Sequence, residues 1–136
     1  MHVQGGCHCG YITYEADIDP DMVRICHCTD CQNLTGSAYR VNVNTPKSRF
    51  KLLTGKPKLY VKTAESGTKR AHGFCPECGT PIYSTANVAD PESYGLRVGT
   101  IRERAQLPPK KMGWCRSQLD WTMSLESLPQ VPKGSQ

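Results

Sequence analysis

The sequence of 136 residues lacks any long hydrophobic run. No stretch approaches the roughly 20 consecutive apolar residues that an α-helix needs to cross a bilayer, so no membrane partner is expected. The segment from Met1 to Cys7 has no basic region followed by an apolar run, which argues against a secretory signal peptide. We therefore expect a cytoplasmic protein.

Large aliphatic and aromatic side chains are also scarce. Leu, Ile, Val and Phe together account for 24 of the 136 residues, a share of about 18%, which is low for a chain held together by apolar burial alone. The length is that of one domain, and no internal repeat suggests a second core. Such a domain needs a further source of stability, either disulfides or bound metal.

Cysteine, in contrast, is abundant. Seven of the eight cysteines occur in C-x-C or C-x-x-C spacings, and Cys115 stands alone. These spacings place sulfurs around a shared ion, whereas a disulfide framework needs well-separated partners and an oxidising compartment. The sequence therefore predicts metal-bound thiolates rather than disulfides.

The positive charge becomes small once these thiolates are counted. The formal net charge is +5 with every cysteine neutral. Seven thiolates add seven negative charges and two zinc ions add four positive ones, which changes the net charge from +5 to +2. The basic residues form short pairs, Lys69–Arg70 and Lys110–Lys111, instead of a run. No nucleic-acid partner is therefore expected.

Short strands separated by turns dominate the expected secondary structure. One short helix is expected from Thr29, where Thr29 and Asp30 can cap the first turn, to Gly36. The expected strands are Tyr11 to Ala16, Tyr39 to Val43, Phe50 to Leu53, Lys58 to Lys62, Thr80 to Thr85, Tyr94 to Val98 and a late strand over Met112 to Gln118. These features predict a mostly antiparallel, all-β domain over residues 1–128, followed by a flexible tail at 129–136.

Cys75 and Cys78 lie in the sequence Cys-Pro-Glu-Cys-Gly, which is typical of a zinc knuckle. The proline sets a turn, the glycine tolerates positive φ, and the two sulfurs face one tetrahedral ion. Cys7 and Cys9 are the simplest source of the other two ligands. The resulting site would be closed, and we predict a structural role for it.

Cys26, Cys28 and Cys31 place three more sulfurs within six residues. One ion can accept all three and keep a fourth position for water or substrate, which is typical of a catalytic metal site. The alternative is a second structural site that a fourth protein ligand closes. The candidates for that ligand are His8, His27, Asp30 and Cys115.

The histidines between cysteines are not expected to be ligands, because neighbours in an extended segment point to opposite sides. His8 and His27 are predicted to lie at the surface or behind the ligands. His27 or Asp30 is a candidate for moving a proton near an open ion. The isolated Cys115 is predicted to be a packed thiol.

Several spaced motifs resemble those of one known family, the glutathione-dependent formaldehyde-activating enzymes, also called the centromere-protein V family. The motifs that carry the resemblance are Gly6-Cys7-His8-Cys9-Gly10, Cys26-His27-Cys28-x-x-Cys31-Gln32 and Phe74-Cys75-Pro76-Glu77-Cys78-Gly79-Thr80-Pro81. Further similar segments are Phe50 to Gly55, Val98-Gly99-Thr100, and Trp121 before Leu128-Pro129. The resemblance covers most of the chain.

The resemblance implies a single-domain β-tent of stacked antiparallel sheets stapled by zinc, with two zinc ions per chain. The implied ligands are Cys7, Cys9, Cys75 and Cys78 for a structural zinc, and Cys26, Cys28 and Cys31 for a second zinc. The family's named reaction joins formaldehyde to glutathione to give S-hydroxymethylglutathione and is assigned to the carbon–sulfur lyases. Glutathione or a related thiol is therefore the expected substrate.

An open zinc suits this reaction, because coordination lowers the pKa of a thiol. Arg40, Lys69 and Arg70 are candidates for binding the carboxylates of glutathione. After Val98-Gly99-Thr100, many family members continue with a Leu-Asp pair, whereas this chain has Ile101-Arg102. The replacement of an acidic by a basic side chain predicts a different substrate preference.

Two other classes of function remain open. In one, both metal sites are structural and the protein is a binding module. In the other, the Cys26, Cys28 and Cys31 cluster is a redox or metal-sensing site, in which oxidation ejects the ion and forms a disulfide. The zinc-dependent lyase ranks first because three sulfurs leave one ligand position free. The sequence leaves the oligomeric state open.

Overall fold

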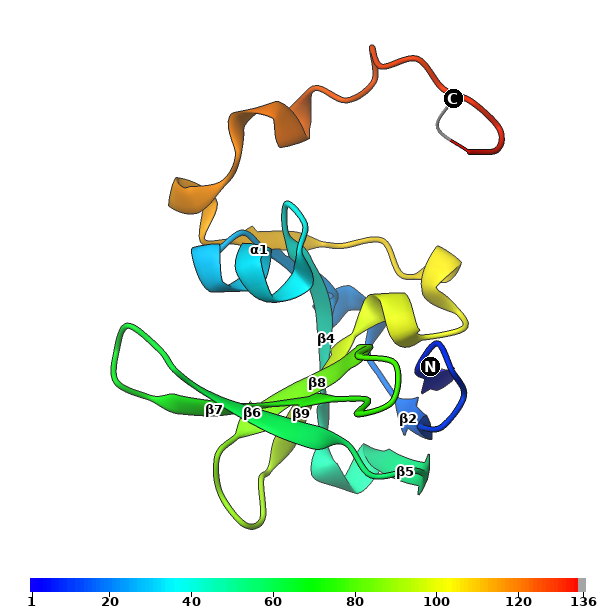
Figure 1. Cartoon of the computed structure of the whole chain (residues 1–136), viewed down its shortest axis with the longest axis vertical. Coiled ribbons are helices and arrows are strands. Elements are labelled where there is room, and N and C mark those ends of the chain that lie inside the picture. Colours follow the sequence, from blue (N-terminus) through cyan, green and yellow to red (C-terminus); the bar gives the residue numbers. More distant parts are fainter. Residues whose placement is uncertain (135–136) are drawn as a thin grey trace.

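The computed structural model describes residues 1–134, which form two β-sheets and one α-helix (Figure 1). The smaller sheet has the strand order β1-β2-β5 and the larger one the order β10-β3-β4-β9-β8-β7-β6. All neighbouring strands are antiparallel except β10 and β3, which are parallel. The predicted mostly antiparallel, all-β architecture with one short helix is confirmed.

The strands are β1 (His2–Gly6), β2 (Thr13–Asp17), β3 (Arg24–Cys26), β4 (Arg40–Pro46), β5 (Phe50–Thr54), β6 (Lys58–Thr63), β7 (Lys69–Phe74), β8 (Pro81–Ala86), β9 (Ser93–Arg97) and β10 (Lys111–Gly113). The α-helix is α1 (Thr29–Thr35). Short 3₁₀ helices in the connections are Pro20–Met22, Lys47–Arg49, Val98–Thr100, Arg104–Gln106, Cys115–Ser117 and Asp120–Met123.

Seven strands overlap the predicted segments, whereas β1, β3 and β7 were not predicted. The buried positions of β7 are Ala71 and Gly73, which are too small to give an apolar alternation among its polar residues. The strand expected over Met112 to Gln118 is wrong beyond Gly113. Trp114 takes a left-handed conformation with φ 54°, which ends the strand and starts the 3₁₀ helix Cys115–Ser117.

The hydrophobic core is small and draws on both sheets. Its most deeply buried members, each at most 1% exposed, include Val3, Ile12, Tyr14, Ile82, Leu96 and Ile101. The Tyr14 hydroxyl is 2.7 Å from Thr100 Oγ1, so this buried phenol has a hydrogen-bond partner. The rings of Phe50 and Tyr94 extend the core, with centroids 4.7 Å apart.

Helix α1 lies beside one end of β4, and the chain after β10 leads away from both sheets (Figure 1). Residues 129–134 are exposed and have no helix or strand; the last two residues of the predicted tail, 135 and 136, lie outside the described residues. Between residues 1 and 134, no helix has the length and apolar character needed to cross a membrane.

Candidate metal centres

Two turns bring four cysteines together at the junction of the two sheets. Cys7 and Cys9 follow β1, and Cys75 and Cys78 lie between β7 and β8. The Sγ atoms of Cys7 and Cys9 are 3.6 Å apart, those of Cys9 and Cys75 are 3.8 Å apart, and all four lie within 4.8 Å of one another. Tetrahedral zinc with bonds of about 2.3 Å places its sulfurs about 3.8 Å apart. The four thiols could therefore hold one metal ion.

Hydrogen bonds around these sulfurs suit thiolates. The Ile12 amide donates to Cys7 Sγ at 3.2 Å. The Thr80 hydroxyl lies 3.2 Å from Cys78 Sγ, and this contact is the main cause that lowers the pKa of Cys78 to about 5. Gly79, with φ of 80°, closes the knuckle, and its amide donates to the Cys75 carbonyl at 2.8 Å. The predicted role of glycine in this turn is confirmed.

A second cluster lies at the start of α1. Cys26 ends β3, Cys28 is the N-cap of α1, and Cys31 is buried in its first turn. Their three Sγ atoms lie within 4.8 Å of one another, so this cluster could also hold a metal ion. In residues 1–134, no fourth cysteine, histidine or carboxylate joins it at this distance.

The first turn of α1 explains why these sulfurs converge. The Cys31 amide donates to Cys28 Sγ at 3.2 Å, so a sulfur caps the helix instead of the predicted Thr29 and Asp30. The Gln32 side chain donates to the carbonyls of His27 and Ser117, each at 2.9 Å. These bonds fix the loop before the helix and the chain after β10 against each other.

Cys26 and Cys31 have pKa values shifted in opposite directions. A hydrogen bond from Cys31 lowers the pKa of Cys26 to about 5, assisted by the positive charge of Arg40 and opposed by burial. The same hydrogen bond raises the pKa of Cys31. Cys26 therefore favours the thiolate, and a divalent cation would favour deprotonation of Cys31 as well.

The four candidates for a fourth ligand lie elsewhere or are otherwise engaged. His27 is only 1% exposed and packs edge-on against Tyr39, so it is not a surface residue. The Asp30 carboxylate pairs with Lys62 Nζ at 3.0 Å. His8 is exposed, as predicted. Cys115 is also exposed, so the prediction of a packed thiol is wrong; its 3₁₀ turn lies on the molecular surface.

Residues 2–117 match the family model of the glutathione-dependent formaldehyde-activating enzymes. The chain belongs to this family. The fold is also similar to the crystal structure of a Rhodobacter sphaeroides protein determined as a structural-genomics target. The TM-score is 0.61 at 22% sequence identity, and the match covers 80% of this chain and 98% of that chain. The resemblance noted from the cysteine motifs is thus confirmed.

The family's reaction with glutathione directs attention to cationic side chains near the second cluster. Arg40 on β4 is the cross-strand partner of Cys26 on β3 and is only 5% exposed. Arg70 is half-buried and donates to Ser84 Oγ at 3.3 Å, while Lys69 is exposed. Among these three predicted candidates, Arg40 alone lines a cavity of about 290 Å³ beside α1.

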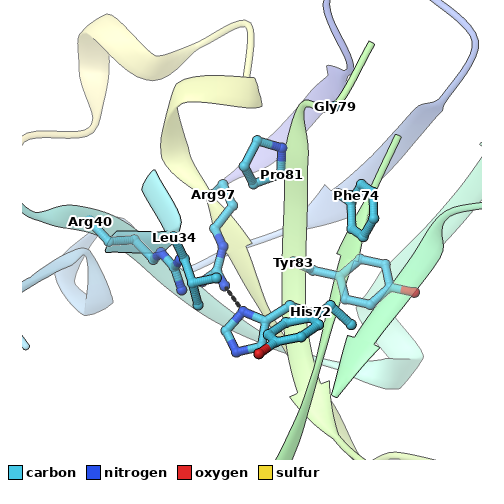
Figure 2. A pocket seen from close by; sticks show the side chains of 9 residues that line it. Leu34, Arg40, His72, Phe74, Gly79, Pro81, Tyr83 and Arg97 are labelled. Carbon is cyan, nitrogen blue, oxygen red and sulfur yellow. Dashed lines mark hydrogen bonds between the residues drawn. The ribbon is translucent and has the colours of Figure 1, made fainter. Parts of the chain in front are cut away.

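Sequence reasoning missed two further residues of that cavity, Arg97 and His72 (Figure 2). Arg97 ends β9 and His72 lies in the middle of β7. Neither belongs to a motif with a chemical signature. Only the strand order β4-β9-β8-β7 shows that they share a cavity with Arg40.

Proposed function

We propose that this family member is a zinc-dependent carbon–sulfur lyase that joins formaldehyde, or a similar carbonyl compound, to glutathione or a related thiol. The observation that carries the proposal is the Cys26, Cys28 and Cys31 cluster, which offers three sulfurs within 4.8 Å. Zinc in proteins is four-coordinate, so three ligands leave one position for a substrate atom. The reaction forms one C–S bond, and the thiol proton ends on the former carbonyl oxygen.

The chain's own residues have separate tasks in this proposal. Zinc at the three-sulfur site would supply the positive charge that lowers the pKa of the substrate thiol. Cys26, Cys28 and Cys31 hold the ion, and the cap of α1 fixes the positions of Cys28 and Cys31. Cys28 also borders a groove of about 520 Å³, which offers a route for substrate to the site.

The four-cysteine site has no vacant position in this proposal. Its ligands come from the turn after β1 and the turn between β7 and β8, which belong to different sheets. A zinc ion there would connect the two sheets and stabilise the fold without taking part in the reaction. The proposed stoichiometry is therefore two zinc ions per chain.

A redox or metal-sensing role is the second candidate, because the pKa of Cys26 is lowered to about 5 by its hydrogen bond from Cys31. A thiolate at neutral pH is the species that peroxide oxidises. In this case Cys26, Cys28 and Cys31 would release their ion on oxidation and form a disulfide. The proposed lyase would not need such a change.

The test combines zinc content with turnover. We expect two zinc ions per chain by elemental analysis of protein purified without chelator, and one in Cys28→Ala. Exchange between glutathione and its formaldehyde adduct, followed by NMR exchange spectroscopy, also measures the uncatalysed reaction. The wild type should accelerate this exchange. The acceleration by Cys28→Ala should be at least about tenfold smaller than that by the wild type.

Cys115→Ala is the matched control, because Cys115 is exposed and lies outside both clusters. It should keep both zinc ions and the wild-type rate. One zinc per chain, or no acceleration by protein with two zinc ions, would overturn the lyase. Release of one ion by mild peroxide, combined with absent turnover, would favour the redox role.

A further inference from the structure

The cavity beside α1 contains two buried arginines that have no acidic partner among residues 1–134. Arg40 and Arg97 are 5% and 6% exposed, and no carboxylate of the described chain lies within ion-pair distance of either. The Nε atoms of both are buried and make no hydrogen bond within this part of the chain. Arg97 donates to Asn42 Oδ1 at 2.5 Å, but a neutral amide does not balance its charge. Burying a guanidinium without an acidic partner is costly, so the arrangement favours a ligand that supplies one.

His72 adds a third donor, and its tautomer follows from its contact with Arg97. Arg97 Nη2 lies 3.1 Å from His72 Nδ1 (Figure 2). A guanidinium only donates, so Nδ1 accepts this hydrogen bond and the proton of the neutral ring is on Nε2. His72 Nε2 is buried and makes no other hydrogen bond to residues 1–134.

The neutral state of His72 is consistent with its surroundings. Burial and the nearby charges of Arg97, Arg40, Lys62 and Arg70 lower the pKa of His72 to about 4. The three unpartnered atoms, two guanidinium Nε groups and one imidazole Nε2, are therefore all donors near neutral pH. A ligand that satisfies them must offer acceptors alone.

The local charge balance also favours an anion. The negative charges that act on the pKa of Arg97 and raise it are those of Cys31 and Cys26. Three thiolates around one divalent ion carry a net charge of −1, which offsets only one of the two guanidiniums. One positive charge remains for a ligand.

The walls of the cavity indicate what carries that anion. Leu34 from α1, Tyr60 from β6, Phe74 from β7 and Pro81 from β8 present apolar surface around the arginines. The cavity of about 290 Å³ accommodates a small organic molecule. Arg40 lies opposite Cys26 in the β3–β4 register, and Leu34 is one helical turn after Cys31, so the cavity borders the second cysteine cluster.

We propose that Arg40, Arg97 and His72 bind the carboxylate of a small organic molecule whose apolar part packs against Tyr60 and Phe74. If the proposed function holds, as this inference assumes, this molecule is a substrate of the adjacent Cys26, Cys28 and Cys31 site. A substrate thiol or carbonyl compound that carries a carboxylate would then be held by its acidic end. Neutral analogues would lose the charge-assisted hydrogen bonds.

The test uses benzoate and benzamide, which have nearly the same shape and differ in charge. Binding to the metal-loaded wild type is measured by calorimetry and by the NMR signals of ¹⁵N-labelled histidine. We expect benzoate to bind at least about tenfold more tightly than benzamide, because a charge-assisted hydrogen bond is worth roughly 1.5–3 kcal/mol. Benzoate should also shift the Nε2 signal of His72.

Arg97→Gln and Arg40→Gln should each weaken benzoate binding at least about tenfold. Arg49→Gln is the matched control, because Arg49 is exposed and lies outside the cavity, and it should bind like the wild type. The wild-type comparison of benzoate with benzamide remains decisive if either cavity variant fails to fold. Equal affinity for the two probes, or an unshifted His72 signal, would overturn the carboxylate site.

Two further probes test whether the bound anion is a carboxylate and whether glutathione carries it. Inorganic phosphate that binds tenfold more tightly than benzoate would overturn the carboxylate assignment. S-methylglutathione should displace benzoate; failure to do so would overturn glutathione as the occupant. Benzoate binding by a protein that does not accelerate the glutathione reaction would count against the proposed lyase and leave the carboxylate site intact.

Discussion

The half-buried imidazole of His72 has a consequence for stability that can be measured directly. Burial and the positive charges of Arg97 and Arg40 lower the pKa of His72 from 6.5 to about 4. Below pH 6.5 the unfolded chain binds a proton that the native state takes up only near pH 4. This residue therefore makes the free energy of unfolding decrease as the pH falls through that range.

His72→Gln replaces the ring by an amide that does not titrate there. We expect the free energy of unfolding of the variant to decrease less steeply between pH 6.5 and pH 4 than that of the wild type. Urea denaturation at several pH values in this range measures both slopes. Protonation of the cysteine clusters affects both proteins alike, so equal slopes would contradict a neutral, half-buried His72.

A glycine beside Tyr14 provides a second test at a single position. A Cβ on Gly5 would lie 2.3 Å from Tyr14 Cζ, and Tyr14 is buried and hydrogen-bonded to Thr100. Gly5→Ala should lower the free energy of unfolding by about 1–3 kcal/mol, because the ring cannot move without losing packing. A Cβ on Gly99 meets nothing within 4 Å, so Gly99→Ala should change the free energy of unfolding by less than about 0.5 kcal/mol. Urea denaturation that gives equal effects would contradict the close packing at Gly5.

At the level of elements, local spacing predicted what lies close together in the chain. Cys26, Cys28 and Cys31 are within six residues, and one turn of helix brings their sulfurs together. Gly36 ends α1 in the left-handed conformation expected of a glycine at that position. The pairing of Cys7 and Cys9 with the knuckle spans more than sixty positions, and it was predicted by counting ligands and by the family resemblance.

The cavity beside α1, with its two arginines and His72, could not be predicted in this way. Arg40, His72 and Arg97 lie on β4, β7 and β9, and only the strand order brings them to one cavity. Strand β7 itself gave no strand signal, because Gly73 occupies a buried position. That glycine is required by the Tyr83 ring, which lies 2.6 Å from the position of a Cβ.

The C-terminal end of α1 can be tested independently of the metal sites. Gly36 has φ of 62°, its amide bonds to the carbonyls of Asn33 and Gln32, and no atom lies near its Cβ position. Gly36→Ala should therefore cost about 1 kcal/mol from backbone conformation alone. Amide hydrogen exchange in Thr29–Thr35 should be faster in Gly36→Ala than in the wild type, because the end of the helix frays. Gly36→Asn should show a smaller increase, since asparagine tolerates this conformation; equal exchange in Gly36→Ala and the wild type would contradict the prediction.

For the molecule as a whole, the two cysteine clusters should differ in what they contribute to stability. The cluster of Cys7, Cys9, Cys75 and Cys78 connects turns of different sheets. The other cluster lies within a single loop and the first turn of α1. Loss of a cross-link between distant segments destabilises a small core more than loss of a local one.

Cys78→Ser and Cys28→Ser compare these two contributions, with Cys115→Ser as the control outside both clusters. We expect Cys78→Ser to lower the midpoint of thermal unfolding by about 10 °C or more. Zinc at this site would contribute several kcal/mol to the free energy of unfolding, and each kcal/mol is worth roughly 3–5 °C in a domain of this size. Cys28→Ser should lose one zinc ion by elemental analysis with a shift of less than about 5 °C. An equal loss of stability in both variants would mean that the second cluster is also structural, and would contradict an open catalytic ion at Cys26, Cys28 and Cys31.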